Sequence, residues 1–264
     1  MFDLHVHSHH SCDAHATMTS MAQAAHAAGL EGLAFTEHVE WLPEDEATGF
    51  LNCAAYFAEL TALREQWQGR LEALAGVEIG STHLFPEETR ALLAAWPWDY
   101  VLGSAHWVEG VPGWLPAGFA DGIQAAYARY FRELVRLARE GEYDVLAHFD
   151  LVRRDSWAQL QQTLPLEGFA ADIDAALQAV VARGKGLEIN TSPLGNGLAE
   201  PCPGLYILRR YRALGGETLV FGSDAHQTPR VGQHFEEARQ LALAAGFTRL
   251  ARYRERQVVG WIPL

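Results

Sequence analysis

The amino-terminal stretch from Phe2 to Asp13, FDLHVHSHHSCD, holds the residues with the clearest capacity for chemistry. Apolar and polar residues alternate at its start, which is the pattern of a β-strand. Alternate side chains of a strand share a face, so His5 and His7 are expected to point the same way. Two imidazoles on one face can hold a divalent metal ion. A lone HxH motif also occurs on exposed edge strands, and the interpretation therefore depends on residues further along the chain.

More imidazoles and carboxylates occur where other buried strands are predicted to end. In a parallel β/α barrel, the carboxyl ends of the strands meet on one face, where active sites lie. Scattered surface histidines would have no reason to fall at equivalent points of several units, so this spacing predicts one shared site. The residues at these positions are His5, His7, His38, Glu78, His106, His148, Asp224 and His226.

The donor types indicate hydrolytic metal chemistry. Imidazole and carboxylate ligands without thiolate suit Zn, Mn or Fe. The donors are too many for one ion with open positions, so we expect two to three divalent transition-metal ions. A carboxylate such as Glu78 can bridge two ions, and ions about 3.5–4 Å apart can hold a phosphoryl group on both sides. We expect Glu78, Asp224 and His226 to serve catalysis as well as metal binding.

Strand and helix patterns alternate along the chain and would position these residues. After the first strand, further strands are predicted at residues 32–36, 71–77, 100–103, 144–147, 186–189 and 218–221. Helices are predicted from Thr17 or Thr19 to about residue 28, at 52–67, from 86, from 123, and at 170–182, 205–214 and 236–245, with two short strands near 250 and 258. Residues 109–122, rich in Gly and Pro, are expected to form a loop over the site.

Seven strand–helix units in succession predict an α/β fold with a parallel sheet, closed or nearly closed into a TIM-barrel-like (β/α)7 barrel. No change of composition and no linker divides the chain. We therefore expect one domain spanning residues 1–264.

The composition excludes some classes of partner. The net charge of −13 argues against nucleic acid and against an acidic membrane surface, since both require a basic face. Three widely spaced cysteines without a CxxC motif suit a reducing compartment, and no apolar run reaches membrane-spanning length, so we expect a cytoplasmic protein. Bound metal ions would still attract a small phosphorylated substrate. We expect a monomer or a homodimer.

The ordered motifs DLHVHS, TEH, GVEIG, GSAHW, LAHFDL, INTSP and GSDAH resemble those of the polymerase-and-histidinol-phosphatase (PHP) superfamily of metal-dependent phosphoesterases. In length and motif wording, the chain is most similar to the histidinol-phosphatase family. The resemblance extends from Phe2 to about Gly232. It implies a distorted seven-unit β/α barrel with a trinuclear metal centre.

The resemblance also implies three ligand groups. His5, His7, Glu78 and Asp224 would hold the first metal; Glu78, His106 and His148 the second; and Asp13, His38 and His226 the third. Asp13 stands where relatives often have histidine, and His15 is the alternative ligand nearby. Glu37 stands where relatives frequently have aspartate, in a supporting role behind the ligands.

The function implied by the resemblance is hydrolysis of a phosphate monoester, most specifically of L-histidinol phosphate in histidine biosynthesis. Arg153 and Arg154, just past the strand that ends at His148, are candidates to hold phosphate oxygens, although a solvated basic turn is the alternative. Asn190 is a candidate to contact the substrate or to fix a ligand. Trp107 and Trp114 are expected to cover the substrate or to pack within the loop.

Three other functions remain open at this point. The same centre can act on another small phosphate ester, such as a nucleotide or phosphotyrosine. A regulatory domain with structural metals is a second alternative, but its site would be coordinatively closed, whereas this one has ligands to spare. A C–N hydrolase on a related barrel would place a lysine near the metals. Lys185 is expected at the opposite end of the barrel.

Overall fold

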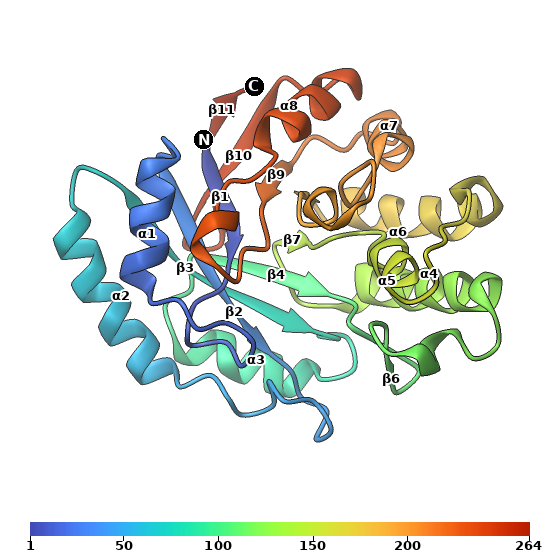
Figure 1. Cartoon of the computed structure of the whole chain (residues 1–264), viewed down its shortest axis with the longest axis horizontal. Helices are drawn as coiled ribbons and strands as arrows, with labels where there is room; N and C mark the ends of the chain where they lie inside the picture. Colours follow the sequence, from blue (N-terminus) through green and yellow to red (C-terminus); the bar gives the residue numbers. More distant parts are fainter.

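Seven parallel strands form one curved sheet in the computed structural model, which describes all 264 residues (Figure 1). Their order in the sheet is β1-β2-β3-β4-β7-β8-β9, so each new strand is added beside the previous one. The strands are β1 (Phe2–Val6), β2 (Gly32–Val39), β3 (Glu72–Gly80), β4 (Tyr100–Ser104), β7 (Val145–Leu146), β8 (Gly186–Asn190) and β9 (Leu219–Gly222).

The two edges of this sheet meet just beyond the ends of β1 and β9. The Asp224 amide donates to the His5 carbonyl at 2.8 Å, and the His7 amide donates to the Ala225 carbonyl at 2.9 Å. A parallel bridge also joins Val6 to Ala225. These contacts nearly close the barrel, and the predicted fold class is confirmed.

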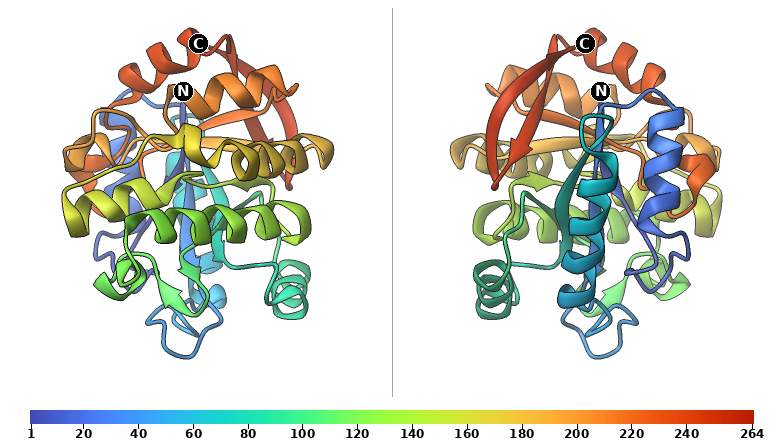
Figure 2. Two further views of the ribbon diagram at one scale, coloured as in Figure 1. Left: turned by 90° about the vertical axis from the view of Figure 1, so that its right-hand side faces the viewer. Right: turned by 90° about the vertical axis from the view of Figure 1, so that its left-hand side faces the viewer.

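Eight α-helices surround the strands, with α1 and α2 on one side and α4 and α6 on the other (Figures 1 and 2). Their buried faces pack on the outer surface of the sheet and form the larger of two apolar clusters. The helices are α1 (Met18–Ala27), α2 (Cys53–Trp67), α3 (Pro86–Ala95), α4 (Ile123–Glu140), α5 (Leu151–Leu160), α6 (Ala170–Ala182), α7 (Leu205–Ala213) and α8 (Phe235–Ala244). None of them combines the length and the apolar character that a membrane crossing needs.

Two segments differ from the sequence-based expectation. No helix was predicted around Arg153, where a solvated basic turn was one alternative, but the structure has helix α5 there, and its first residues Leu151 and Val152 are buried against the barrel. Within the expected loop 109–122, the structure has strand β6 (Val111–Pro112) and the short helix η1 (Pro116–Phe119). Strand β6 pairs antiparallel with β5 (Trp107–Val108), which lies just before the loop. The β5–β6 pair and η1 are too short to carry a periodic signal, and the buried face of α5 includes the polar residues Asp155 and Ser156, which interrupt its apolar pattern.

The amino-terminal end of the barrel is covered by the hairpin of β10 (Arg249–Arg254) and β11 (Gln257–Pro263). Ala251 and Tyr253 of β10 belong to the smaller apolar cluster, which otherwise consists of residues of β1, β2, β3, β4, β7 and β9 and of Ala147. The Tyr253 ring lies 5.1 Å, centroid to centroid, from that of Tyr100. Arg256, in the turn of the hairpin, pairs with Asp144 at the start of β7, at 3.0 Å. The β10–β11 hairpin therefore closes the end of the barrel opposite the predicted site.

We predict that Tyr253→Ala lowers the free energy of unfolding by about 3–5 kcal/mol, because it leaves a cavity under the barrel where an aromatic ring was buried. Urea denaturation followed by circular dichroism measures this change. Phe50→Ala is the matched control: its ring is 48% exposed, and the expected change is within about 0.5 kcal/mol. Equal effects of the two substitutions would show that the hairpin does not complete the core.

Candidate metal centre

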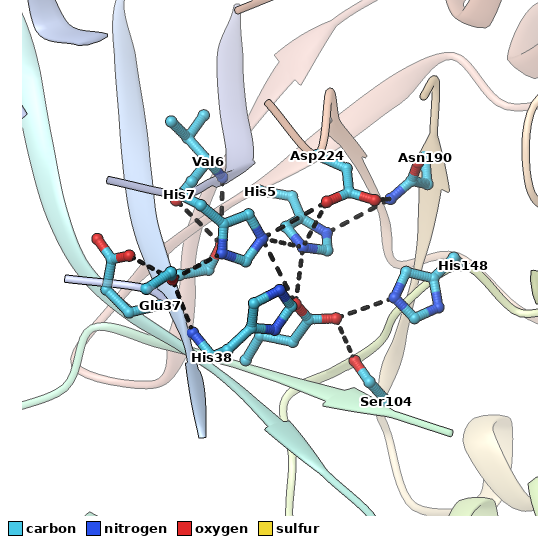
Figure 3. A network of polar contacts seen from close by, with 12 residues as sticks. His5, Val6, His7, Glu37, His38, Ser104, His148, Asn190 and Asp224 are labelled. Carbon is cyan, nitrogen blue, oxygen red and sulfur yellow. Dashed lines mark hydrogen bonds and ion pairs between the residues drawn. The ribbon is translucent and has the colours of Figure 1, made fainter. Parts of the chain in front are cut away.

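The first group of predicted ligands converges at the carboxyl end of β1. The Nε2 atoms of His5 and His7 lie 3.0 Å apart, which confirms that the two side chains share a face (Figure 3). Asp224 Oδ1 lies 3.6 Å from His5 Nε2 and 3.5 Å from His7 Nε2. Glu78 Oε2 lies 3.1 Å and 3.5 Å from the same two nitrogens. Four donors thus face one small volume.

The second oxygen of Glu78 faces a different group of donors. Glu78 Oε1 lies 2.9 Å from His148 Nε2 and 3.3 Å from His106 Nε2. Ser104 Oγ donates a hydrogen bond to the same oxygen and orients the carboxylate. Since its two oxygens face two sets of imidazoles, Glu78 has the geometry of a carboxylate that bridges two ions.

The third group contains Asp13, His38 and His226. Asp13 Oδ2 lies 3.0 Å from His226 Nε2 and 3.5 Å from His38 Nε2. His38 Nδ1 also lies 3.0 Å from Glu78 Oε2, so this ring stands between the groups. His15 is exposed and forms no hydrogen bond or ion pair. The structure brings Asp13, rather than His15, to the site.

The outer nitrogens of the imidazoles show that the site suits cations. His5 Nδ1 lies 2.6 Å from Glu188 and His106 Nδ1 lies 2.7 Å from Glu40; because a carboxylate only accepts, both nitrogens donate a proton outward. His226 Nδ1 donates to the Asp224 carbonyl at 3.0 Å. Each Nε2 can therefore turn a lone pair toward the centre, the arrangement typical of metal-bound histidine. The donor set fits two or three divalent ions.

The charged state of the ligands also suits metal binding. Burial alone would raise the pKa of Glu78, but the imidazoles of His5, His106 and His38 outweigh it and hold that pKa well below its usual range. Asp224 behaves in the same way, with His5 as the main opposing charge, and its pKa is also well below normal. Burial, together with His38 and His226, holds the pKa of His7 well below its usual value. The two carboxylates are therefore ionised and His7 is neutral, as a cation site requires. Burial alone would lower the pKa of His5, His38 and His106, but the facing carboxylates outweigh it and raise these pKa values, that of His106 to about 9, so a metal ion must displace protons from these imidazoles.

These ligands are positioned by three carboxylates that had no role predicted from the sequence. Glu188 holds His5 and also accepts from the His148 amide at 2.8 Å, and Glu40 holds His106. Asp3 accepts from the amides of Ser223 and Gly232, at 2.9 and 2.8 Å, and so ties the start of β1 to the loop after β9. Strand alternation could have indicated all three carboxylates, because each of them lies two residues along the chain from a predicted site residue.

Glu37 takes the supporting role suggested for it. It accepts from Ser8 Oγ and Ser11 Oγ, both at 2.6 Å, and from the Ser8 amide at 3.0 Å. Ser11 Oγ in turn lies 3.1 Å from His7 Nδ1. The loop that follows β1 is thereby fixed behind the ligands.

The three residues predicted to bind substrate are in different surroundings. Arg154 lines the cavity, and its Nη1 donates to Asp224 Oδ2 at 3.1 Å. Arg153 lies outside the cavity lining and is paired with Asp150 at 3.0 Å, so its expected contact with substrate is not supported. Asn190 is fully buried and donates to Glu188 and Asp224, at 3.3 and 3.4 Å. It fixes these two carboxylates and is not part of the cavity lining, and its contact with substrate stays a prediction.

A cavity of about 700 Å³ opens over the donor groups. This volume suits a small-molecule substrate. Trp107 and Trp114 lie on its wall, as expected, with their rings edge to face at 6.1 Å between centroids. The predicted metal ligands that line the cavity are Asp13, His38, Glu78, His106, His148, Asp224 and His226.

Comparisons with known proteins agree with this arrangement. Residues 3–192 match the model of the PHP domain family. A probable histidinol-phosphatase of Deinococcus radiodurans is 30% identical over 97% of this chain and 98% of the relative. The histidinol-phosphatase of Lactococcus lactis subsp. lactis is 26% identical over 95% of this chain and 93% of its own length.

A solved structure shares the fold over almost the whole chain. It is the crystal structure of histidinol phosphate phosphatase from Lactococcus lactis subsp. lactis, complexed with zinc, L-histidinol and phosphate. Its TM-score to this chain is 0.89 at 24% identity, and the match covers 98% of each chain.

We predict that Glu78→Gln lowers kcat by about two to three orders of magnitude, the usual cost of losing a preorganised charge at a reacting centre. The substitution keeps the volume and the fold, but it removes the charge shared by two donor groups, so metal content should fall as well. Phosphate release and elemental analysis measure both effects. Glu140→Gln, on the exposed end of α4, is the control and should match wild type. Near wild-type turnover in Glu78→Gln would exclude a bridging role.

A second prediction separates Asp13 from His15. Asp13→Ala should weaken one bound ion selectively and lower kcat, because it removes the oxygen that faces His38 and His226. His15→Ala should leave metal content and turnover nearly unchanged. Metal analysis after dialysis against a weak chelator distinguishes the two variants. The reverse pattern would make His15 the ligand.

Proposed function

This chain belongs to the PHP domain family, and on that premise we propose that it is a metal-dependent phosphatase that hydrolyses L-histidinol phosphate to L-histidinol and phosphate. One observation carries the proposal: imidazoles and carboxylates from five other strand ends surround Glu78 at the floor of an open cavity. The choice of substrate rests on relatives named histidinol-phosphatase that align over nearly the whole chain.

Different side chains have different roles in the proposed reaction. The bound ions would neutralise phosphate oxygens and lower the pKa of water toward neutrality. Arg154 supplies the one guanidinium on the cavity wall, and its contact with Asp224 fixes it beside the ligand groups. A guanidinium can donate to two phosphate oxygens at once and so orient the phosphoryl group. Trp107 and Trp114 border the space left for the alcohol and limit the access of water.

The alternatives from the sequence have less support. A closed structural metal site would not sit on the floor of a cavity of about 700 Å³. A C–N hydrolase would need a lysine at the centre. Lys185 lies just before β8, near the Tyr143 ring at 5.8 Å, and it is absent from the cavity lining.

We also propose a cytoplasmic protein whose partner is a small phosphorylated molecule rather than nucleic acid. The three cysteines are free, which suits a reducing compartment. The net charge of −13 disfavours binding to nucleic acid, because it repels phosphate wherever no metal ion is bound.

The proposal is tested by phosphate release from L-histidinol phosphate, phosphotyrosine and nucleoside monophosphates. L-histidinol phosphate should have the highest kcat/KM, and dialysis against a strong chelator should abolish its hydrolysis until a divalent metal ion is restored. A clear preference for another ester would replace the substrate but keep the chemistry. Full activity in metal-free protein would refute the proposal.

A matched pair of variants tests the arginine assignment. Arg154→Lys should lower kcat/KM about tenfold, because lysine keeps the charge but loses one hydrogen bond of the fork, about 1.5 kcal/mol. Arg153→Lys, which can keep its ion pair with Asp150, should stay within about twofold of wild type. A larger loss in Arg153→Lys would reverse the assignment.

A further inference from the structure

The loop after β1 carries two adjacent histidines that take no part in the metal centre. His9 and His10 follow the predicted ligand His7, yet neither of them lines the cavity. Their rings lie beside each other, at 4.3 Å between centroids, on the side of the loop that faces α2. Both Nε2 atoms approach one carboxylate oxygen of that helix, Glu59 Oε2, at 3.2 Å from His9 and 2.9 Å from His10.

These three donors are spaced like the ligands of one ion. The two Nε2 atoms and the Glu59 oxygen all lie within 4.8 Å of one another. In a tetrahedral zinc site, whose bonds are about 2.0–2.2 Å long, neighbouring ligand atoms lie about 3.4 Å apart. The two contacts with Glu59 are close to this separation, so small side-chain movements would admit an ion.

The bonding of this cluster leaves its donors available. Only the contact from His10 has the geometry of a hydrogen bond, so the Glu59 oxygen keeps unused acceptor capacity. Neither histidine has a protein partner at Nδ1. Each ring can therefore carry its proton at Nδ1, facing water, and offer the Nε2 lone pair to an ion. Glu59 pairs with no arginine or lysine that would compete with a cation.

The fold holds both sides of the cluster in place. The His9 amide donates to the Ala16 carbonyl at 2.8 Å, which fixes the loop. The His10 ring meets the buried Tyr56 ring edge to face at 5.7 Å. Tyr56 and Glu59 are three residues apart on α2, so they share one face of the helix. Donors that are already ordered lose less conformational freedom when a ligand binds.

From this geometry we propose that His9, His10 and Glu59 form a second metal site, separate from the main centre, that binds one zinc ion. Water would fill the fourth position, because the His9 side chain is 38% exposed. Two imidazoles and one carboxylate suit zinc, whereas calcium and magnesium require mostly oxygen ligands. The ion would join the loop that carries Asp13 to α2 from the outer side of the barrel.

The test compares zinc content in Glu59→Gln and His9→Ala with that of the wild-type protein. After equilibrium dialysis against buffered free zinc, elemental analysis should find about one ion per chain fewer in each variant. Zinc affinity at this site should fall at least about tenfold, since even residues that only support a ligand have effects of that size. Glu237→Gln is the matched control, because it removes an exposed carboxylate that lies 3.0 Å from His234. It should keep the wild-type zinc content.

A crystal of the wild-type protein soaked in zinc provides a second measurement. An anomalous difference map should show a peak between His9, His10 and Glu59, in addition to the peaks of the main centre. Equal zinc content in all variants, or no peak at this position, would overturn the inference. Loss of more than one ion in His9→Ala would also overturn it, because the cluster would then support the main centre. Zinc content and the map report on this site whichever ester the protein hydrolyses.

Discussion

The arrangement depends most on one constraint, the convergence of buried donors on Glu78. Its two oxygens face imidazoles from different strands at 2.9–3.5 Å, and the carboxylate is almost completely buried. The imidazoles of His5, His106 and His38 compensate the buried charge of Glu78, because they hold its pKa well below the usual range. Metal ions bound between the same groups would replace the protons of these imidazoles and supply the positive charge in their place.

The contacts that nearly close the barrel are also contacts of the metal centre. The sheet edges are joined through the backbones of His5, His7 and Asp224, which are all proposed ligands. Asp224 and His148 have positive φ angles of 55° and 25°, a backbone conformation that residues other than glycine rarely adopt. Neighbouring hydrogen bonds stabilise this strained backbone at the two proposed ligands, and one of them runs from the His148 amide to Glu188. Fold closure and ligand geometry are therefore coupled.

The cavity above the centre separates two kinds of charge. Metal donors and Arg154 lie at the floor, where cations would hold a phosphate, and unpaired carboxylates lie on the wall after β2. A protein with a net charge of −13 can thus attract a phosphate ester, because the attraction is confined to the metal ions and one guanidinium.

The sequence by itself determined the barrel and the candidate ligands. Strand alternation placed His5 and His7 on one face, and the parallel order of the strands placed His38, Glu78, His106, His148 and Asp224 at one end. These are local or topological properties, and they can be read along the chain. Only the tertiary structure distinguished Arg154 from Arg153, because the two point differently from one short helix whose pattern is too weak to predict. Only tertiary structure, likewise, paired Glu188 with His5 and Glu40 with His106, since these contacts join residues 183 and 66 positions apart. Such partners are set by the curvature of the barrel, which no local pattern specifies.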